Sequence, residues 1–95
     1  MKVLWTATAQ HHLASIFDYI AKDSPEYALR TVDRLTRRTQ QIALFPRSGR
    51  RVPEYDVDSV REVIEGSYRI VYSCGTQAIV ILAVLHGARD IPPRE

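Results

Sequence analysis

The sequence predicts an α+β fold in which an antiparallel helical hairpin packs on one mostly antiparallel sheet. Apolar residues recur at spacings of three and four in the first half of the chain, and runs rich in β-branched and aromatic residues fill the second half. The expected order is an N-terminal strand, two helices and a three-stranded antiparallel meander. We expect a single domain over residues 1–95, because either half alone would bury too small a core.

The first helix is predicted over residues 8–22, after a strand over residues 2–5. Either Thr6 or Thr8 can supply its N-cap, because a threonine hydroxyl accepts a hydrogen bond from a free backbone N–H of the first turn. The apolar stripe of this helix consists of Leu13, Ile16, Phe17 and Ile20. This spacing follows the helical period, so the helix is expected to turn one side to the sheet.

A second helix is predicted to begin directly after Asp23. Ser24 suits the N-cap, Pro25 the first helical position and Glu26 the positive end of the helix dipole. The residues expected to face the core are Ala28, Val32, Leu35, Thr39 and Ile42. The helix should end at Phe45, because a residue before proline avoids the helical conformation.

Positive charge is concentrated on arginines of the second helix and of the segment after it. The chain has 13 Lys and Arg against 11 Asp and Glu, which gives a net charge of +2. The clustered arginines are Arg30, Arg34, Arg37, Arg38, Arg47, Arg50 and Arg51. Those on the helix lie opposite its apolar stripe. They form either a solvated face or a surface for an acidic partner or a phosphate backbone.

The second half of the chain predicts an exposed loop followed by three strands. The loop covers residues 47–59 and contains Gly49 and Pro53 among several charges. The strands are predicted over residues 60–64, 68–74 and 78–85. The last of them is apolar at every position, so it should be buried on both faces at the centre of the sheet.

The turn Gly75-Thr76 suits a two-residue hairpin, which would pair Cys74 with Gln77 and Arg69 with Leu82. The face expected to pack on the helices then carries Tyr68, Ile70, Tyr72, Ile79, Ile81, Ala83 and Leu85. The other face carries Arg69 and His86, with Arg89 in the turn that follows. Arginine neutralises phosphate charge and histidine transfers protons near neutral pH, so this group suits phosphodiester chemistry. A solubilising arginine and a structural histidine are the alternative.

The sequence contains no motif that predicts a metal or another cofactor. His11 and His12 are adjacent and diverge around a helix, and Cys74 has no neighbouring group that would activate it. Glycine-rich phosphate loops and the HExxH and GxSxG patterns do not occur. A single cysteine favours a reducing cytoplasm. The longest apolar run, residues 78–85, is far shorter than the roughly 18 residues of a membrane span.

Several short sequence motifs in the chain resemble those of a known family. They are Trp5 with Ala9, Tyr19-Ile20-Ala21, Ser24-Pro25, residues 44–50, Arg61-Glu62-Val63, residues 66–72 and residues 84–89. With these motifs the chain resembles the RelE/ParE toxin superfamily, and its ParE branch most closely. The resemblance spans nearly the whole chain and implies a helical hairpin against a curved antiparallel sheet.

The resemblance also implies a biological role. Members are toxins of type II toxin–antitoxin modules, and a cognate antitoxin wraps and neutralises each toxin in a hetero-oligomeric complex. RelE-like toxins cut mRNA on the ribosome, whereas ParE-like toxins inhibit DNA gyrase and block replication. This chain has no terminal tyrosine, and its net charge of +2 is low for a nuclease that acts on ribosome-bound RNA. These departures favour the gyrase branch.

Particular residues take roles from the same resemblance. Arg69 matches a strand arginine that RelE-like nucleases place at phosphate, Arg89 matches a second arginine, and His86 lies near an acid–base histidine of some nucleases. We predict that Arg61, Arg69, His86 and Arg89 form the surface that contacts the target. One alternative is an mRNA endoribonuclease in which Arg69 and Arg89 bind phosphate and His86 is the acid–base. The other is a non-toxic module that only binds the antitoxin.

Overall fold

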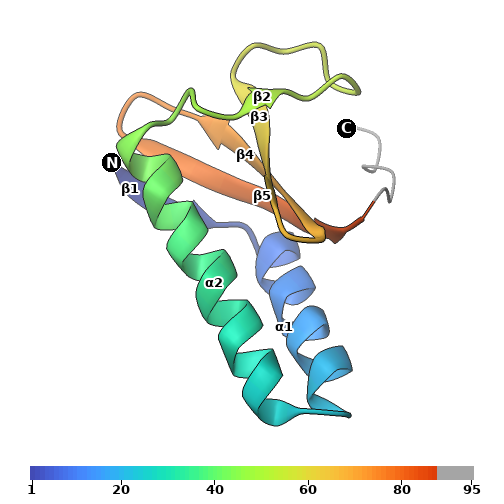
Figure 1. The fold of residues 1–95 in the computed structure, drawn as a ribbon. Helices are drawn as coiled ribbons and strands as arrows, with labels where there is room; N and C mark the ends of the chain where they lie inside the picture. Colours follow the sequence, from blue (N-terminus) through green and yellow to red (C-terminus); the bar gives the residue numbers. More distant parts are fainter. Residues whose placement is uncertain (88–95) are drawn as a thin grey trace.

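The computed structural model describes residues 1–87 and has the predicted α+β architecture (Figure 1). Its elements are β1 (Lys2–Trp5), α1 (Ala7–Ala21), α2 (Pro25–Leu44), β2 (Arg50–Arg51), β3 (Val60–Glu65), β4 (Tyr68–Cys74) and β5 (Ala78–His86). The strands form one sheet in the order β1-β5-β4-β3-β2. β1 runs parallel to β5, and the other neighbouring pairs are antiparallel. The predicted fold class is confirmed.

The two helices begin and end at the signals that the sequence carries. Thr6 caps α1, because its hydroxyl accepts a hydrogen bond of 3.0 Å from the backbone N–H of Ala9. Ser24 caps α2 in the same way, at 3.1 Å from the N–H of Tyr27, and Pro25 is the first helical residue. α2 ends one residue before Phe45. The caps and breaks are local, which is why they could be predicted.

The helices pack side by side on one face of the sheet, and their connected ends project beyond it (Figure 1). Leu35 and Ile42 of α2 meet Ile79 and Ile81 of β5 in the main core, where all four side chains are fully buried. β5 lies between β1 and β4, as its apolar sequence predicts. The residues predicted to face the core from α2 are buried, except that Val32 is half-buried. Thr31 and Ala43, which were not in the prediction, are buried as well.

The predicted register between β4 and β5 is wrong. Cys74 pairs with Ile79 instead of Gln77, so residues 75–78 form a longer connection in which the Gly75 N–H donates to the Ala78 carbonyl at 2.9 Å. A bulge follows, because Tyr72 pairs with Ile81 while Val71 pairs with Ala83. One extra residue of β5 is thereby left without a partner on β4, and the side chains beyond it change faces.

The N-terminus of α1 holds this bulge in place. The Thr6 N–H donates to the Ile81 carbonyl at 3.1 Å, and the Val84 N–H donates to Nδ1 of His12 at 3.2 Å. Because of the bulge, Ala83 and Leu85 lie on the face away from the helices, which corrects the prediction that they pack against them. Val84 packs in the main core instead. The register thus depends on contacts between residues far apart in the sequence.

The segment between α2 and β3 is more ordered than the predicted exposed loop. It contains the short strand β2, which pairs with β3, and Val52, which is fully buried. Tyr55 and Val57 of the same segment pack on a second apolar cluster formed by Val52, Val60, Val71, Ala83 and Leu85. The segment therefore covers part of the face of the sheet that the helices leave free.

Candidate functional site

A buried carboxylate on β3 lies beneath this segment and holds two arginines. The Glu62 side chain is fully buried, and its Oε2 accepts hydrogen bonds from Nε and Nη2 of Arg50 at 3.0 and 2.8 Å. Its other oxygen, Oε1, accepts a hydrogen bond from Nη2 of Arg69. Glu54 lies 3.6 Å from the same Nη2. We call these four residues the Glu62 cluster.

Glu62 and Arg69 are both stabilised in their charged forms. Burial by itself would raise the pKa of Glu62, but the hydrogen bonds from Arg69 and Arg50 outweigh it and hold that pKa below the ordinary value. The hydrogen bond to Glu62 is the main cause that raises the pKa of Arg69 above its ordinary value. The signal in the sequence for this cluster was Glu62 itself, an acidic residue within a strand beside Val63 and Ile64, because a buried carboxylate requires a partner.

Two of the predicted target residues, Arg69 and His86, lie on opposite faces of the sheet. Arg69 lies on the sheet face away from the helices, where its side chain is only 12% exposed. His86 is exposed on the opposite face at the end of β5, paired with Tyr68, and the two rings meet edge-to-face with centroids 5.2 Å apart. Arg89 lies outside the described residues. The expected grouping of Arg69 with His86 is therefore wrong, and the bulge is the reason.

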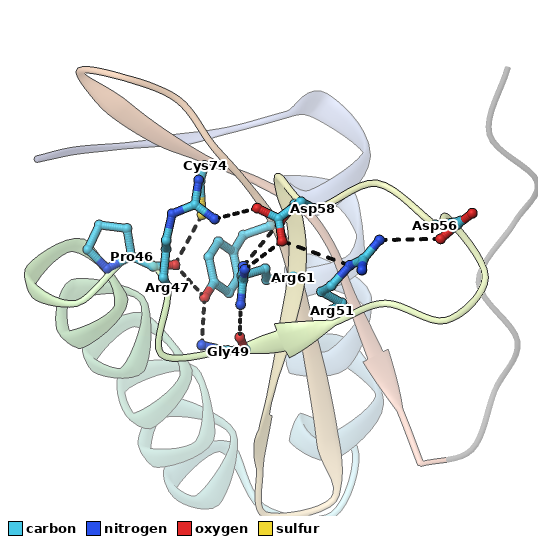
Figure 2. Close-up of polar contacts among 9 residues, drawn as sticks. Pro46, Arg47, Gly49, Arg51, Asp56, Asp58, Arg61 and Cys74 are labelled. Carbon is cyan, nitrogen blue, oxygen red and sulfur yellow. Dashed lines mark hydrogen bonds and ion pairs between the residues drawn. The ribbon is translucent and has the colours of Figure 1, made fainter.

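Arg61 belongs to a second group, which surrounds the carboxylate of Asp58 at the exposed edge of the sheet (Figure 2). Nη1 of Arg47 lies 2.7 Å from Oδ2 of Asp58, and Nη2 of Arg61 lies 2.9 Å from Oδ1. Nε of Arg51 lies 3.9 Å from the same Oδ1, and Nη2 of Arg51 lies 3.3 Å from Oδ1 of Asp56. We call these five residues the Asp58 cluster. The hydrogen bond from Arg47 is the main cause that lowers the pKa of Asp58.

A buried tyrosine fastens the start of this segment to the core (Figure 2). The Tyr72 hydroxyl accepts a hydrogen bond from the Gly49 N–H at 3.0 Å and donates one to the Pro46 carbonyl at 2.8 Å. Nη1 of Arg61 donates to the Gly49 carbonyl at 2.9 Å. A Cβ at Gly49 would lie 2.5 Å from the Tyr72 hydroxyl and 2.6 Å from the Glu62 carbonyl, so glycine is required there. The hydrogen bonds to Pro46 and Gly49 fix the backbone on both sides of Arg47, and this keeps its side chain beside Asp58.

The arginines of α2 point away from the core, as predicted. Arg37 pairs with Asp33 at 3.0 Å, one turn earlier on the same helix. Arg34 and Arg38 both reach Glu65 at the end of β3, each at 3.5 Å. This outer face thus carries ion pairs that link α2 to the sheet.

An apolar groove lies at the edge of the sheet opposite β2, between β1 and the helices. It encloses about 740 Å³ and is lined by Val3, Leu4, Trp5, Gln10, Leu13, Ala14, Phe17, Val32 and Thr36. Leu4 is 50% exposed in it. Within residues 1–87, β5 is the only strand that pairs with β1, so the outer edge of β1 is open. An open edge beside an apolar groove suits an extended partner segment.

Metal sites and membrane helices were also sought in the described part of the chain. Residues 1–87 contain no group of three or more His, Cys, Asp or Glu side chains that could hold a metal ion. Neither of the two helices there has the length and apolar character that crossing a membrane requires.

Comparison with known proteins places the chain in a family. The family model described as "ParE toxin of type II toxin-antitoxin system, parDE" matches residues 3–91. The chain belongs to the ParE toxin family. A curated relative, "Putative toxin Y4kP" of Sinorhizobium fredii (strain NBRC 101917 / NGR234), is 32% identical over 93 residues, which cover 96% of this chain and 93% of the relative. The predicted family is confirmed, and the chain is a toxin of the type II toxin–antitoxin class.

Two solved structures share the fold of this ParE-family toxin. One is described as "Chromosomal ParDE TA system from P. aeruginosa", with a TM-score of 0.75, 24% identity, and coverage of 92% of this chain and 96% of that chain. The other is described as "YoeB/ParE toxin from Agrobacterium tumefaciens", with a TM-score of 0.59, 16% identity, and coverage of 90% and 98%. The sheet and helical hairpin of this chain therefore recur in both of these structures.

Proposed function

We propose that this toxin acts by binding and inhibiting DNA gyrase, and that it has no nuclease activity of its own. The observation that supports the proposal most is the state of Arg69, the strand arginine that a RelE-like nuclease would place at phosphate. Its guanidinium is bound by the buried Glu62 and lies close to Glu54. A cation that stabilises charge in a transition state must face the substrate, and this one faces two carboxylates of its own chain.

The contact surface for gyrase is proposed around the end of β5. His86 is exposed there beside Tyr68, and Arg89 follows in the sequence. Aromatic and arginine side chains are common anchors of protein interfaces. Arg61 and Arg69 also organise the Asp58 and Glu62 clusters, so substitutions at these two positions affect stability as well as any target contact.

The cognate antitoxin is proposed to occupy the apolar groove beside β1. An extended antitoxin segment can add to the open edge of β1 through backbone hydrogen bonds, while apolar side chains fill the groove. Gyrase contact at the end of β5 and antitoxin binding at β1 then use different parts of the surface. This separation allows each activity to be removed by itself.

The target is tested with two assays on the purified toxin. The first adds the toxin to DNA gyrase with relaxed plasmid, and the second adds it to translating ribosomes and maps the mRNA by primer extension. Blocked supercoiling with intact mRNA is expected. Codon-phased cuts with normal gyrase activity would establish the ribonuclease alternative. Activity in neither assay, with normal growth after induction, would establish the non-toxic binding module.

The antitoxin surface is tested with a matched pair of substitutions. Leu4→Glu places a charge in the groove, and Leu29→Glu places one on α2 at a leucine that does not line it, with exposures of 50% and 62%. Leu4→Glu should weaken capture by the antitoxin and leave gyrase inhibition intact, whereas Leu29→Glu should change neither. Equal loss of antitoxin binding in both variants would show that the groove is not the main contact.

A further inference from the structure

The Asp58 cluster has more guanidinium groups than its carboxylate can satisfy. Asp58 presents two carboxylate oxygens, which lie within hydrogen-bond distance of Arg47 and Arg61 at 2.7 and 2.9 Å. Arg51 comes no closer to Asp58 than 3.9 Å and instead bonds to Asp56 at 3.3 Å. With three arginines against two aspartates, the cluster has a net charge of +1. An anion with more oxygens than a carboxylate would fit these arginines better.

The cluster is held in position but accessible. Arg61 is fixed by hydrogen bonds to the Gly49 and Asp58 carbonyls at 2.9 and 3.2 Å, and its side chain is only 15% exposed. Arg47 and Arg51 are 63% and 52% exposed, and Asp58 is 60% exposed. One arginine thus forms a fixed base, while the other two can turn their free N–H groups towards a ligand.

We propose that Arg47, Arg51 and Arg61 form a phosphate-binding site that Asp58 occupies in the free toxin. Guanidinium groups bind phosphate oxygens with the same paired geometry that they use for carboxylates, and phosphate offers a further oxygen for the third arginine. The Asp58 side chain is therefore an internal competitor that an incoming phosphate displaces. The ligand is a phosphate group, carried either by a nucleic-acid backbone or by a free phosphate compound. The site shares Arg61 with the residues predicted to contact the target, and none of its three arginines lines the groove proposed for the antitoxin.

Removal of the internal competitor is the direct test. Asp58→Asn should bind a short fluorescein-labelled single-stranded DNA roughly tenfold more tightly than the unmodified toxin does, measured by fluorescence anisotropy at low salt. The plot of log affinity against log salt should steepen by about 1 to 2, because the released arginines add phosphate contacts. Addition of Arg47→Ala and Arg51→Ala to the same protein should abolish the gain.

Asp33→Asn is the matched control. Asp33 also forms an exposed ion pair with an arginine, Arg37 at 3.0 Å, so its substitution makes the same change in net charge elsewhere on the surface. This variant should bind DNA about as weakly as the unmodified toxin. If Asp33→Asn and Asp58→Asn bind equally well, the effect is one of overall charge and the proposal is overturned.

A milder substitution keeps the test valid if Asp58→Asn does not fold. Asp56 is 96% exposed and contacts Arg51, and asparagine accepts its backbone φ of 44°. Asp56→Asn should therefore fold normally and give a smaller gain than Asp58→Asn. No gain over Asp33→Asn would contradict the proposal.

Competition with inorganic phosphate distinguishes the two sources of the ligand. Displacement of the DNA at a matched phosphate concentration assigns the site to a free or terminal phosphate group. Resistance to displacement assigns it to the phosphodiester backbone. If Asp58→Asn binds neither DNA nor inorganic phosphate, the site does not exist.

Discussion

Two carboxylates in this toxin are each surrounded by arginines, and they differ in burial. Glu62 is fully buried and Asp58 is 60% exposed, although each contacts guanidinium groups at hydrogen-bond distance. A buried charge is costly to leave without a partner, so the Glu62 cluster must stay intact for the fold to persist. An exposed ion pair is screened by water and exchanges partners readily. The same chemistry therefore serves structure in one place and is available for binding in the other.

The largest expected effect comes from removing one partner of Glu62. Arg69→Ala leaves this carboxylate with Arg50 alone and should lower the free energy of unfolding by about 3–5 kcal/mol. Arg37→Ala, which removes the outer partner of an exposed pair on α2, should cause no measurable loss. Urea denaturation followed by circular dichroism compares the two. Similar stabilities for the two variants would mean that Glu62 does not need Arg69.

The next largest effect on stability is expected at Tyr72, which connects the segment carrying the Asp58 cluster to the core. Tyr72→Phe removes the hydroxyl that bonds to Gly49 and Pro46, and should lower the free energy of unfolding by about 1–3 kcal/mol. Tyr19→Phe is the control, because Tyr19 is 75% exposed and should tolerate the change. Thermal unfolding measures both. An unchanged melting temperature for Tyr72→Phe would show that the other contacts of the segment hold it without the Tyr72 hydroxyl.

Acid should destabilise the toxin through Glu62 in particular. The pKa of Glu62 is lowered by folding, so its contribution is fully present above the unfolded pKa of about 4.3 and is lost as the pH falls through the lower folded value. A plot of stability against pH should therefore decline below about pH 4. Glu62→Gln should reduce this slope, and high salt should not, because burial protects the pair from screening. A slope that Glu62→Gln leaves unchanged would assign the acid sensitivity to exposed groups.

The smallest effect on stability is expected at the exposed carboxylate. Asp58→Asn should leave the free energy of unfolding within experimental error of the unmodified toxin at high salt, since Asp58 contacts its arginines in water. The same substitution is expected to change phosphate binding strongly. A loss of stability comparable with that of Arg69→Ala would show that Asp58 is part of the framework.

The sequence alone determined the features that depend on local chemistry. Thr6, Ser24, Pro25 and the break before Pro46 define the two helices through hydrogen bonds and backbone restrictions within a few residues. The apolar run of β5 predicts its central position, and the family motifs predict the ParE toxin family. Each of these signals lies within one element or one short motif, so it can be read directly from the order of residues in the sequence.

Only the tertiary structure decided which side chains face each other across the sheet. The bulge in β5 depends on Thr6 and His12, which bond to residues more than 70 positions away. A shift of one residue exchanges the faces of a strand, and it therefore separated Arg69 from His86. The partners of Glu62 and Asp58 come from β2, β3, β4 and the segments beside β2. Which arginines lie close to these two carboxylates depends on how the strands pack, because a charged side chain pairs with an opposite charge only where the fold places one nearby.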